Sequence, residues 1–400
     1  MNILFVNDSP FNPIVGGIER VTDILAKELV SRGHNVYFLC GKIRPEKRYL
    51  LRYEYAGVLY ELPNYGLFED QENKDYYELL QDDLKINVVV NQRGLGGWFN
   101  SILPITHNKV ISVIHSTPEG NINIFLNQLV ELTSPPFVGL KKLIKRTFPF
   151  LFSYYWEKKV SKIEKKKYND LAKHSSAIVL LSDKYQSVLK KFIDSYSTTR
   201  IFAIPNPNSF RSVYVSNEVK KKTVLYVGRL TKLEKEPMRL LRIWKRIYKE
   251  HPDWNLKIVG DGDEMQKMIL YVKEHGLGNV YFEGEKSEVI KYYQDASIVC
   301  LTSNFEGWGM VLTEGMQYGC IPFTFNNYGA AYDIIDDGVN GFLIPAFDLR
   351  KYAKCMSELM SNESRRVRMS NAAIEKVKLF SVENVADKWE NLLSLVLCEV

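Results

Sequence analysis

The chain has 400 residues, of which 46% are hydrophobic and 25% are charged, and its formal net charge is +6. This composition is ordinary for a folded globular protein and excludes disordered and collagen-like chains. The length predicts two domains, because single hydrophobic cores rarely grow beyond about 250–300 residues.

The cysteines and the apolar segments indicate a cytoplasmic location. The five cysteines are scattered and contain no Cys-x-x-Cys pair, so neither a disulfide framework nor a zinc site is indicated. The opening residues, MNILFVND, are typical of a strand rather than of a signal peptide. The most apolar run, 148–156, is far shorter than the ~20 residues needed to cross a bilayer. We therefore expect no transmembrane helix.

Short apolar segments alternate with segments of helical periodicity along the first half of the chain. This pattern is typical of α/β folds with parallel sheets. A helix is predicted over 17–32, and Gly33 follows it as the glycine expected after a helix end. The predicted strands are 3–6, 36–40, 88–91, 110–114 and 177–181.

The second half repeats the same scheme after a polar stretch with two prolines, 204–222, which we interpret as an interdomain linker. The predicted strands are 223–227, 256–259, 280–283, 298–302 and 321–324. The predicted helices are 237–250, 263–275, 287–294 and 310–318, with further helices from about Asp348 onwards.

The predicted domains are 1–203 and 204–380, with a final helix, 381–400, that packs back on the first domain. Two Rossmann-like domains joined by one linker imply a cleft between them. In parallel sheets of this kind, ligands bind beyond the carboxyl ends of the strands, where loops meet the N-termini of helices. The motifs of interest follow predicted strands.

A basic motif follows the predicted strand 223–227. Gly228 and Arg229 come directly after it, and Lys232 and Lys235 follow. An arginine at this position can bind phosphate through two hydrogen bonds, and a lysine can add a point charge. A solvated basic loop would have the same sequence, and both interpretations stay open for this motif alone.

A glycine-rich loop with two glutamates follows the predicted strand 298–302. Gly307 and Gly309 carry no side chains, so amides at the start of the next helix can approach an anion or sugar hydroxyls closely. Glu306 lies in the loop, and Glu314 lies eight residues later within the helix. Solvated helix faces also carry such glutamate pairs, so the spacing alone predicts little.

Taken together, these segments resemble the retaining glycosyltransferases of family 4. EGWGMVLTEGMQYGCIPF resembles the family's EGFG…E segment with its Glu-x7-Glu pair, and VGRLTKLEKEP resembles its VGRL…EKG phosphate-binding segment. NILFVND…GGIERV and GHNVYFL resemble the N-terminal domain of the family. The resemblance covers about 1–40 and 223–345. It implies the GT-B fold, in which two Rossmann-like domains face each other across a cleft.

The resemblance implies a role for each matching residue. Arg229 and Lys235 would bind the donor pyrophosphate, Glu314 the ribose and Glu306 the donor sugar. The sugar would also meet the backbone amides of Gly307, Trp308, Gly309 and Met310. Gly284 would border the base, Gly16 and Gly17 would line the cleft near the phosphates or the acceptor, and His115 would contact the donor sugar.

Three departures from the family pattern leave some of these assignments open. Ser116 stands where an acidic residue usually follows the histidine, and Trp308 stands where phenylalanine is usual. Glu236 replaces the glycine that follows the phosphate-binding lysine. The choice between Lys232 and Lys235, and the detailed role of His115, therefore stay open.

Other polar motifs receive a structural interpretation. The sequence Gly-Asp-Gly-Asp at 260–263 could form a metal-binding Asp-x-Asp or part of a dinucleotide fingerprint. It lacks the third glycine of such a fingerprint, so we interpret Asp263 as the N-cap of the next helix. Glu19 and Arg20 are interpreted as surface residues of helix 17–32. No metal site is predicted.

The segment 137–173 is basic and aromatic. Between 141 and 173 it contains eleven lysines or arginines and three acidic residues. Such a segment suits peripheral contact with an anionic membrane at the inner face of the cell membrane. A solvated helix with inward-facing aromatic side chains is the equal alternative. Nucleic-acid binding is not expected, because no nucleic-acid module accompanies the segment.

The function implied by the resemblance is that of a retaining glycosyltransferase of the hexosyltransferase type. It would transfer a sugar from a nucleotide-diphosphate-sugar donor to a glycan or lipid-linked glycan acceptor, in cell-surface polysaccharide or glycolipid synthesis. Neither a cofactor nor a metal is expected to be required. The alternatives are a nucleotide-sugar epimerase of the same fold and a non-catalytic nucleotide-sugar-binding protein. A nicotinamide dehydrogenase is not expected, since Gly-x-Gly-x-x-Gly follows none of the predicted strands.

Overall fold

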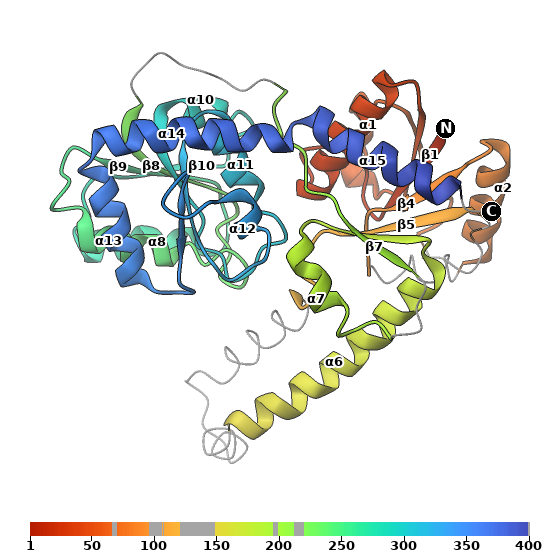
Figure 1. Ribbon diagram of the computed structural model, residues 1–400, viewed down its shortest axis with the longest axis horizontal. Helices are drawn as coiled ribbons and strands as arrows, with labels where there is room; N and C mark the ends of the chain where they lie inside the picture. Colours follow the sequence, from red (N-terminus) through yellow and green to blue (C-terminus); the bar gives the residue numbers. More distant parts are fainter. Residues whose placement is uncertain are drawn as a thin grey trace. The chain divides into compact units, whose positions relative to one another are not determined.

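The computed structural model divides the chain into two compact units (Figure 1). Unit 1 comprises Met1–Pro207 and Val382–Val400, and unit 2 comprises Asn208–Ser381. The structure describes residues 1–65, 70–95, 106, 108–120, 149–194, 199–211 and 220–398, with side chains from residue 158 onwards in the helix that begins at Pro149.

Unit 1 contains a seven-stranded parallel sheet with the strand order β3-β2-β1-β4-β5-β6-β7. Its strands are β1 Asn2–Asn7, β2 Asn35–Cys40, β3 Val58–Glu61, β4 Val88–Asn91, β5 Lys109–Ile114, β6 Ala177–Leu180 and β7 Arg200–Ala203. The five predicted strands are confirmed. The two strands that the sequence did not predict, β3 and β7, lie at the two edges of the sheet and have no fully buried residue.

The helices of unit 1 follow its strands along the chain. They are α1 Gly17–Ser31, α2 Gln71–Asp83, α6 Pro149–His174, α7 Gln186–Leu189 and α15 Val382–Leu397, with short 3-10 helices at Pro45–Arg52 and Asp183–Tyr185. Gly33 has a φ of +86° after the end of α1, as predicted. The C-terminal helix α15 packs against α1, and its residues Trp389 and Leu392 belong to the same hydrophobic cluster as Leu25 and Leu29.

Unit 2 contains a six-stranded parallel sheet with the strand order β10-β9-β8-β11-β12-β13. Its strands are β8 Lys221–Val227, β9 Asn255–Val259, β10 Val280–Gly284, β11 Ala296–Cys300, β12 Ile321–Phe325 and β13 Phe342–Ile344. Its helices are α8 Met238–Ile247, α9 Met265–Glu274, α10 Ile290–Asp295, α11 Met310–Gln317, α12 Ala331–Ile334, α13 Leu349–Met360 and α14 Glu363–Val377, with a 3-10 turn at Lys378–Phe380.

The end of β11 differs from the prediction for a reason that matters to the site. The strand was expected to reach Thr302 but ends at Cys300. Leu301 still donates its amide to Phe323 of the next strand. Thr302 instead contacts the loop after β8, since its hydroxyl donates to the carbonyl oxygen atoms of Lys235 and Glu236 at 3.4 and 3.3 Å. The chain thus leaves the sheet at the point where the glycine-rich loop begins.

The chain crosses between the units at Pro207/Asn208 and at Ser381/Val382. The two segments on the unit 2 side are bonded to each other. The amide of Asn208 donates to Phe380 O at 2.8 Å, and its side chain donates to Val377 O at 2.9 Å. Of the expected linker 204–222, residues 212–219 lie outside the described residues. Among the helices that are described, none combines the length and the hydropathy that a membrane span requires.

Candidate functional site

The loop after β8 carries the basic motif of unit 2. Arg229 is largely exposed, and its guanidinium donates to the carboxylate of Glu234 at 2.7 Å. The hydroxyl of Tyr226 donates to the carbonyl oxygen of Arg229 at 3.1 Å, which fixes the backbone there. An exposed ion pair of this kind contributes little to stability and is easily exchanged for another anion. Arg229 is therefore available for a ligand at the carboxyl end of the sheet.

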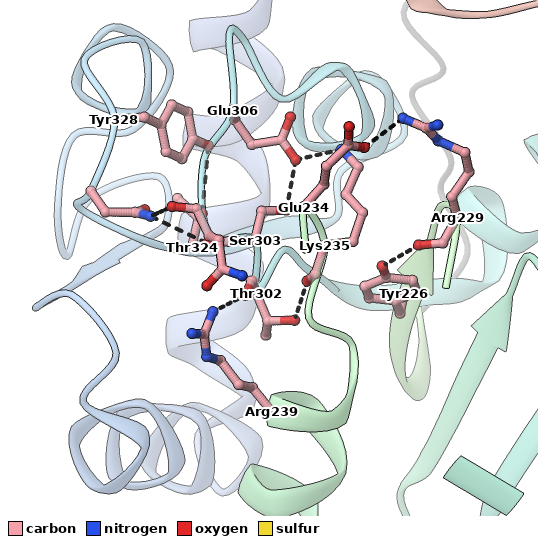
Figure 2. A network of polar contacts seen from close by, with 12 residues as sticks. Tyr226, Arg229, Glu234, Lys235, Arg239, Thr302, Ser303, Glu306, Thr324 and Tyr328 are labelled. Atoms are coloured by element: carbon pink, nitrogen blue, oxygen red, sulfur yellow. Dashed lines mark hydrogen bonds and ion pairs between the residues drawn. The ribbon is translucent and has the colours of Figure 1, made fainter. Parts of the chain in front are cut away.

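Lys235 and Glu306 form the central ion pair of the site (Figure 2). The Lys235 Nζ lies 2.5 Å from Glu306 Oε1, and the two side chains are 22% and 10% exposed. The hydroxyl of Ser303 donates to the same carboxylate oxygen at 2.6 Å. The pair joins the loop after β8 to the loop after β11, because these two strands are parallel neighbours in the sheet. Lys232, the other candidate, is exposed.

Two asparagines that were not predicted as site residues hold the loops together. The Asn304 side chain donates to the carbonyl oxygen atoms of Lys232 and Leu233 at 3.3 and 2.8 Å. The Asn327 side chain, after β12, donates to those of Ser303 and Asn304 at 3.2 and 2.6 Å. Three loops from three adjacent strands are thereby held in one arrangement. Both asparagines lie within four residues of the end of a buried strand, and this position was the available sequence signal.

The glycine-rich loop leads into α11 at Gly309. This residue has a φ of +95°, in the left-handed region that favours glycine. A Cβ added here would lie 3.0 Å from the hydroxyl oxygen of Tyr328. The ring of Trp308 is buried and packs edge-on against Phe380, with 5.0 Å between the ring centroids. Within unit 2, Trp308 can therefore offer a ligand its backbone amide, while its side chain anchors the loop.

Glu314 lies one turn into α11 and is only 1% exposed. The hydroxyl of Ser209 donates to its Oε1 at 2.6 Å, and that of Tyr293 donates to its Oε2 at 2.7 Å. Both carboxylate oxygens thus have hydroxyl partners from the same unit. Each carboxylate oxygen can accept a further hydrogen bond, and Oε1, which meets Ser209, is on the less buried side and is the one a ribose hydroxyl could reach.

Gly284 and the Gly-Asp-Gly-Asp segment lie at the ends of β10 and β9. Gly284 has a φ of +70°, and its carbonyl oxygen accepts the amide of Gly260 at 2.8 Å. A Cβ on Gly260 would lie 2.0 Å from the carbonyl oxygen of Gly228, so this glycine permits close packing of two strand ends. The expected N-cap is wrong: the cap position of α9 is Glu264, without a side-chain hydrogen bond, and not Asp263. Helix α9 begins at Met265, one residue later than an N-cap at Asp263 would place it.

The remaining predicted residues belong to unit 1. His115 follows β5, and its Nε2 lies 2.6 Å from Gln92 Oε1, at the end of β4. Burial lowers the pKa of His115 to about 4, so the ring is neutral at pH 7. Gly16 precedes α1 with an extended backbone, and Gly17 has no atom within 4 Å of an added Cβ.

Glu19 corrects the expectation of a surface position. It is 7% exposed, and its carboxylate accepts hydrogen bonds from the Asn7 side chain at 2.9 Å and the Ser9 hydroxyl at 3.0 Å. Its carboxylate oxygen would lie 2.8 Å from a Cβ on Gly16. The glutamate folds back under the N-terminus of α1 because strand β1 supplies it with hydrogen-bond donors. Gly16 is therefore needed for packing around this carboxylate.

The structure groups Arg229, Lys235 and Glu306 at one edge of unit 2, beside the start of α11. Within the described ranges, no group of three or more His, Cys, Asp or Glu side chains is placed to hold a metal ion. Of the basic aromatic segment, the described side chains are those of α6 from residue 158 onwards. Lys158, Lys159, Lys162 and Lys166 are exposed there, beside Ile163, which is 48% exposed.

Glu236 occupies the position where the family has glycine, and its backbone has a φ of +40°. A non-glycine residue in this left-handed region costs about 1–3 kcal/mol. Burial also raises the pKa of its carboxyl group, with Arg239 and Arg242 acting in the opposite direction. The raised pKa means that the charged carboxylate disfavours the fold, and that this penalty grows as pH rises through the folded-state pKa.

We therefore expect Glu236→Gly to raise the free energy of unfolding by about 1 kcal/mol at pH 7, after allowance for the flexibility that glycine adds to the unfolded chain. Glu236→Gln keeps the strained backbone and removes only the charge. The increase in the free energy of unfolding that Glu236→Gln gives should be present at pH 7 and vanish at pH 4. For Glu236→Gly, the part of the increase that comes from relief of backbone strain should persist at pH 4. Urea unfolding at both pH values tests this. A glycine variant less stable than the parent would show that the backbone carries no strain.

The comparisons with known proteins agree with this architecture. Residues 15–207 match glycosyltransferase family 4, and residues 212–376 match the family of group 1 glycosyl transferases. An uncharacterized glycosyltransferase of Haemophilus influenzae is 29% identical over 201 residues, which are 50% of this chain and 57% of the relative. The amylovoran biosynthesis glycosyltransferase AmsD of Erwinia amylovora is 29% identical over 188 residues, 47% of this chain and 51% of the relative. The chain thus spans about half the length of these curated relatives.

Solved structures show the fold. The pneumococcal O-GlcNAc transferase GtfA, in complex with UDP and GlcNAc, has a TM-score of 0.74 and 14% identity, covering 100% of this chain and 99% of its own. The lipopolysaccharide outer core galactosyltransferase WaaB has a TM-score of 0.70 and 16% identity, covering 99% of both chains. The predicted fold class, two Rossmann-like parallel-sheet domains of GT-B type, is confirmed.

Proposed function

We propose that this chain transfers a sugar from a nucleotide-diphosphate-sugar to an acceptor hydroxyl with retention at the anomeric carbon. Its residues 15–207 match glycosyltransferase family 4, and its residues 212–376 match the group 1 glycosyl transferases. The observation that carries the proposal is the Lys235–Glu306 pair beside exposed Arg229 and the start of α11. These residues offer cations for a pyrophosphate, a carboxylate for sugar hydroxyls, and backbone amides at a helix N-terminus.

The proposed reaction places negative charge on the leaving diphosphate, where the two cations lie. The bond between the anomeric carbon and the diphosphate oxygen breaks while the acceptor oxygen bonds to the same face of that carbon. The acceptor proton passes to the departing phosphate oxygen. Arg229 and Lys235 stabilise the negative charge on the leaving diphosphate, and Glu306 holds the sugar by its hydroxyls. Because the two cations neutralise this charge, the proposal requires neither a metal nor a cofactor.

The acceptor is proposed to be a glycan or a lipid-linked glycan. The name of a Campylobacter jejuni relative, 28% identical over 49% of this chain and 55% of its own, describes N-acetylgalactosamine transfer to an undecaprenol-linked glycan. The amylovoran relative is named for polysaccharide synthesis. We propose the same setting for this chain, at the inner face of the cell membrane.

A thermal-shift screen over a panel of nucleotide-sugars tests donor binding, since a selective ligand raises the melting temperature by mass action. Turnover is then measured as release of the nucleoside diphosphate, with and without glycan acceptors. Formation of an isomeric nucleotide-sugar without acceptor would indicate an epimerase instead. Tight binding of a donor without turnover on any acceptor would indicate a non-catalytic binding protein.

Arg229→Ala should lower kcat/KM with the identified donor by about a hundredfold, because one of two cations at the leaving group is lost. The exposed pair with Glu234 contributes little to stability, so the melting temperature should stay unchanged. Arg246→Ala removes an exposed arginine from α8 of the same unit and serves as the matched control. Equal turnover in the two variants would remove Arg229 from the proposed site.

Membrane contact is proposed for the exposed face of α6. Lys158, Lys162 and Lys166 follow one another at four-residue spacing, with Lys159 and half-exposed Ile163 beside them. This face combines positive charge with apolar surface, which suits an anionic bilayer.

The chain should float with vesicles that contain phosphatidylglycerol and remain in solution with pure phosphatidylcholine. Replacing Lys158, Lys159, Lys162 and Lys166 by Glu should weaken binding at least about a hundredfold, at about 1 kcal/mol for each lost charge. The same four-charge reversal at Lys245, Lys249, Lys273 and Lys291 of unit 2 is the control. If both variants float as the parent does, the membrane proposal is wrong.

A further inference from the structure

The carboxyl edge of the unit 1 sheet brings His115 against a buried amide. His115 follows β5, and Gln92 follows the neighbouring parallel strand β4. The imidazole Nε2 lies 2.6 Å from the carboxamide oxygen Oε1 of Gln92. Gln92 is 2% exposed and His115 is half-buried, so the contact is part-buried.

The structure orients the Gln92 carboxamide with its oxygen toward His115, and this orientation sets the tautomer of the histidine. A carboxamide oxygen can only accept a hydrogen bond, so the hydrogen between the two atoms belongs to Nε2. The ring is neutral at physiological pH, because burial holds its pKa at about 4. A neutral ring carries one hydrogen only, and Nδ1 therefore presents a lone pair that accepts a hydrogen bond.

Hydrogen bonds and close packing fix the backbone that carries the Gln92 side chain. The backbone N–H of Gln92 donates to Val6 O of β1 at 3.1 Å. The side chain of Asn91 closes the turn after β4 by donating to Gly94 O at 3.0 Å. Gly94 has a φ of +59°, and a Cβ there would lie 2.8 Å from Val113 O of β5. The turn is thus pressed against the strand that carries His115.

We propose that Gln92 is a positioning residue that locks His115 in the Nε2–H tautomer, so that Nδ1 accepts a hydrogen bond from a ligand hydroxyl at the carboxyl edge of the unit 1 sheet. This inference rests on the proposed transferase function for its purpose, while the tautomer itself does not depend on any ligand.

Nuclear magnetic resonance of the full chain labelled with ¹⁵N-histidine tests the tautomer directly, with His115→Gln used to assign the signal. The expected spectrum shows a protonated Nε2, an unprotonated Nδ1, and an Nε2 proton protected from exchange with water. In Gln92→Leu, which matches the side chain in size without an acceptor, that protection should be lost. A protonated Nδ1 in the parent, or equal protection in Gln92→Leu, would overturn the proposal.

Turnover then separates positioning from folding. With the donor that the thermal-shift screen identifies, Gln92→Leu should lower kcat/KM about tenfold, the value of one misplaced hydrogen bond. Gln92→Glu retains an acceptor oxygen and should restore both the protected proton and most of the activity at pH 8. If Gln92→Leu melts like the parent and is fully active, Gln92 does not position His115. If no donor binds at all, the transferase proposal fails while the tautomer result stands.

Discussion

Lys235→Met should lower turnover by about a hundredfold to a thousandfold, the largest effect expected of any single change in the molecule. The lysine is the less exposed of the two cations assigned to the leaving group, and it lies beside the carboxylate assigned to the sugar. The substitution should also destabilise unit 2 by about 2–3 kcal/mol, because it leaves the carboxylate of Glu306 largely buried and without its cation.

A second substitution separates these two consequences. When Lys235→Met is combined with Glu306→Gln, the buried negative charge is removed, and the new carboxamide oxygen can still accept from the Ser303 hydroxyl. The double variant should therefore regain most of the lost stability without regaining turnover. Urea unfolding and nucleoside-diphosphate release measure the two quantities on the same samples. Recovery of both stability and turnover would show that the pair is structural only.

Lys232→Met is the matched control for this experiment. Lys232 lies three residues earlier in the same loop, and its side chain is exposed. We expect its replacement to change stability and turnover less than Lys235→Met does, since the charge of an exposed lysine is screened by water. A larger loss of turnover in Lys232→Met than in Lys235→Met would transfer the phosphate-binding role to Lys232.

Gly309→Ala should have the second-largest effect, on donor binding and on stability together. The new Cβ would sit at a φ of +95°, at a cost of about 1–3 kcal/mol, and 3.0 Å from the hydroxyl oxygen of Tyr328. The first turn of α11 must shift to relieve this contact, and the amides of Gly307 to Met310 move with it. Donor affinity, measured by calorimetry, should fall about tenfold or more.

Two controls identify the cause. Adding Tyr328→Phe to Gly309→Ala removes the hydroxyl but not the backbone strain, so it should recover part of the lost stability. Gly17→Ala, at the start of α1, has no atom within 4 Å of the new Cβ and should leave the free energy of unfolding nearly unchanged. If Gly309→Ala binds the donor as tightly as the parent, the amides before α11 do not form the sugar site.

The sequence determined where the buried strands lie, because a central strand of a parallel sheet is covered on both faces and must be apolar along its length. β4 and β12 are such segments, with every residue buried. The edge strands β3 and β7 were missed because one side of each is open, and β13 because it has only three residues. The loops after β8 and β11 could be located because each directly follows one of these apolar segments.

The tertiary structure alone decided which of the candidate residues meet. Lys235 and Glu306 are 71 residues apart, and they pair because β8 and β11 are neighbours in the sheet, an order that local periodicity does not encode. Glu306 and Glu314 looked alike in sequence. The loop turns the first toward Lys235, whereas the helix buries the second between Ser209 and Tyr293.

The environment of a side chain was likewise outside the reach of the sequence. Nothing in the pattern around Glu19 distinguishes it from a surface glutamate of a helix, yet Asn7 and Ser9 hold it in the interior. His115 was found by resemblance, but its hydrogen-bond partner is Gln92, a residue that follows another strand. Local sequence fixes where a strand or loop lies, because hydrophobic burial acts on segments. The strength and direction of a polar interaction depend on partners that only the fold brings within hydrogen-bonding distance.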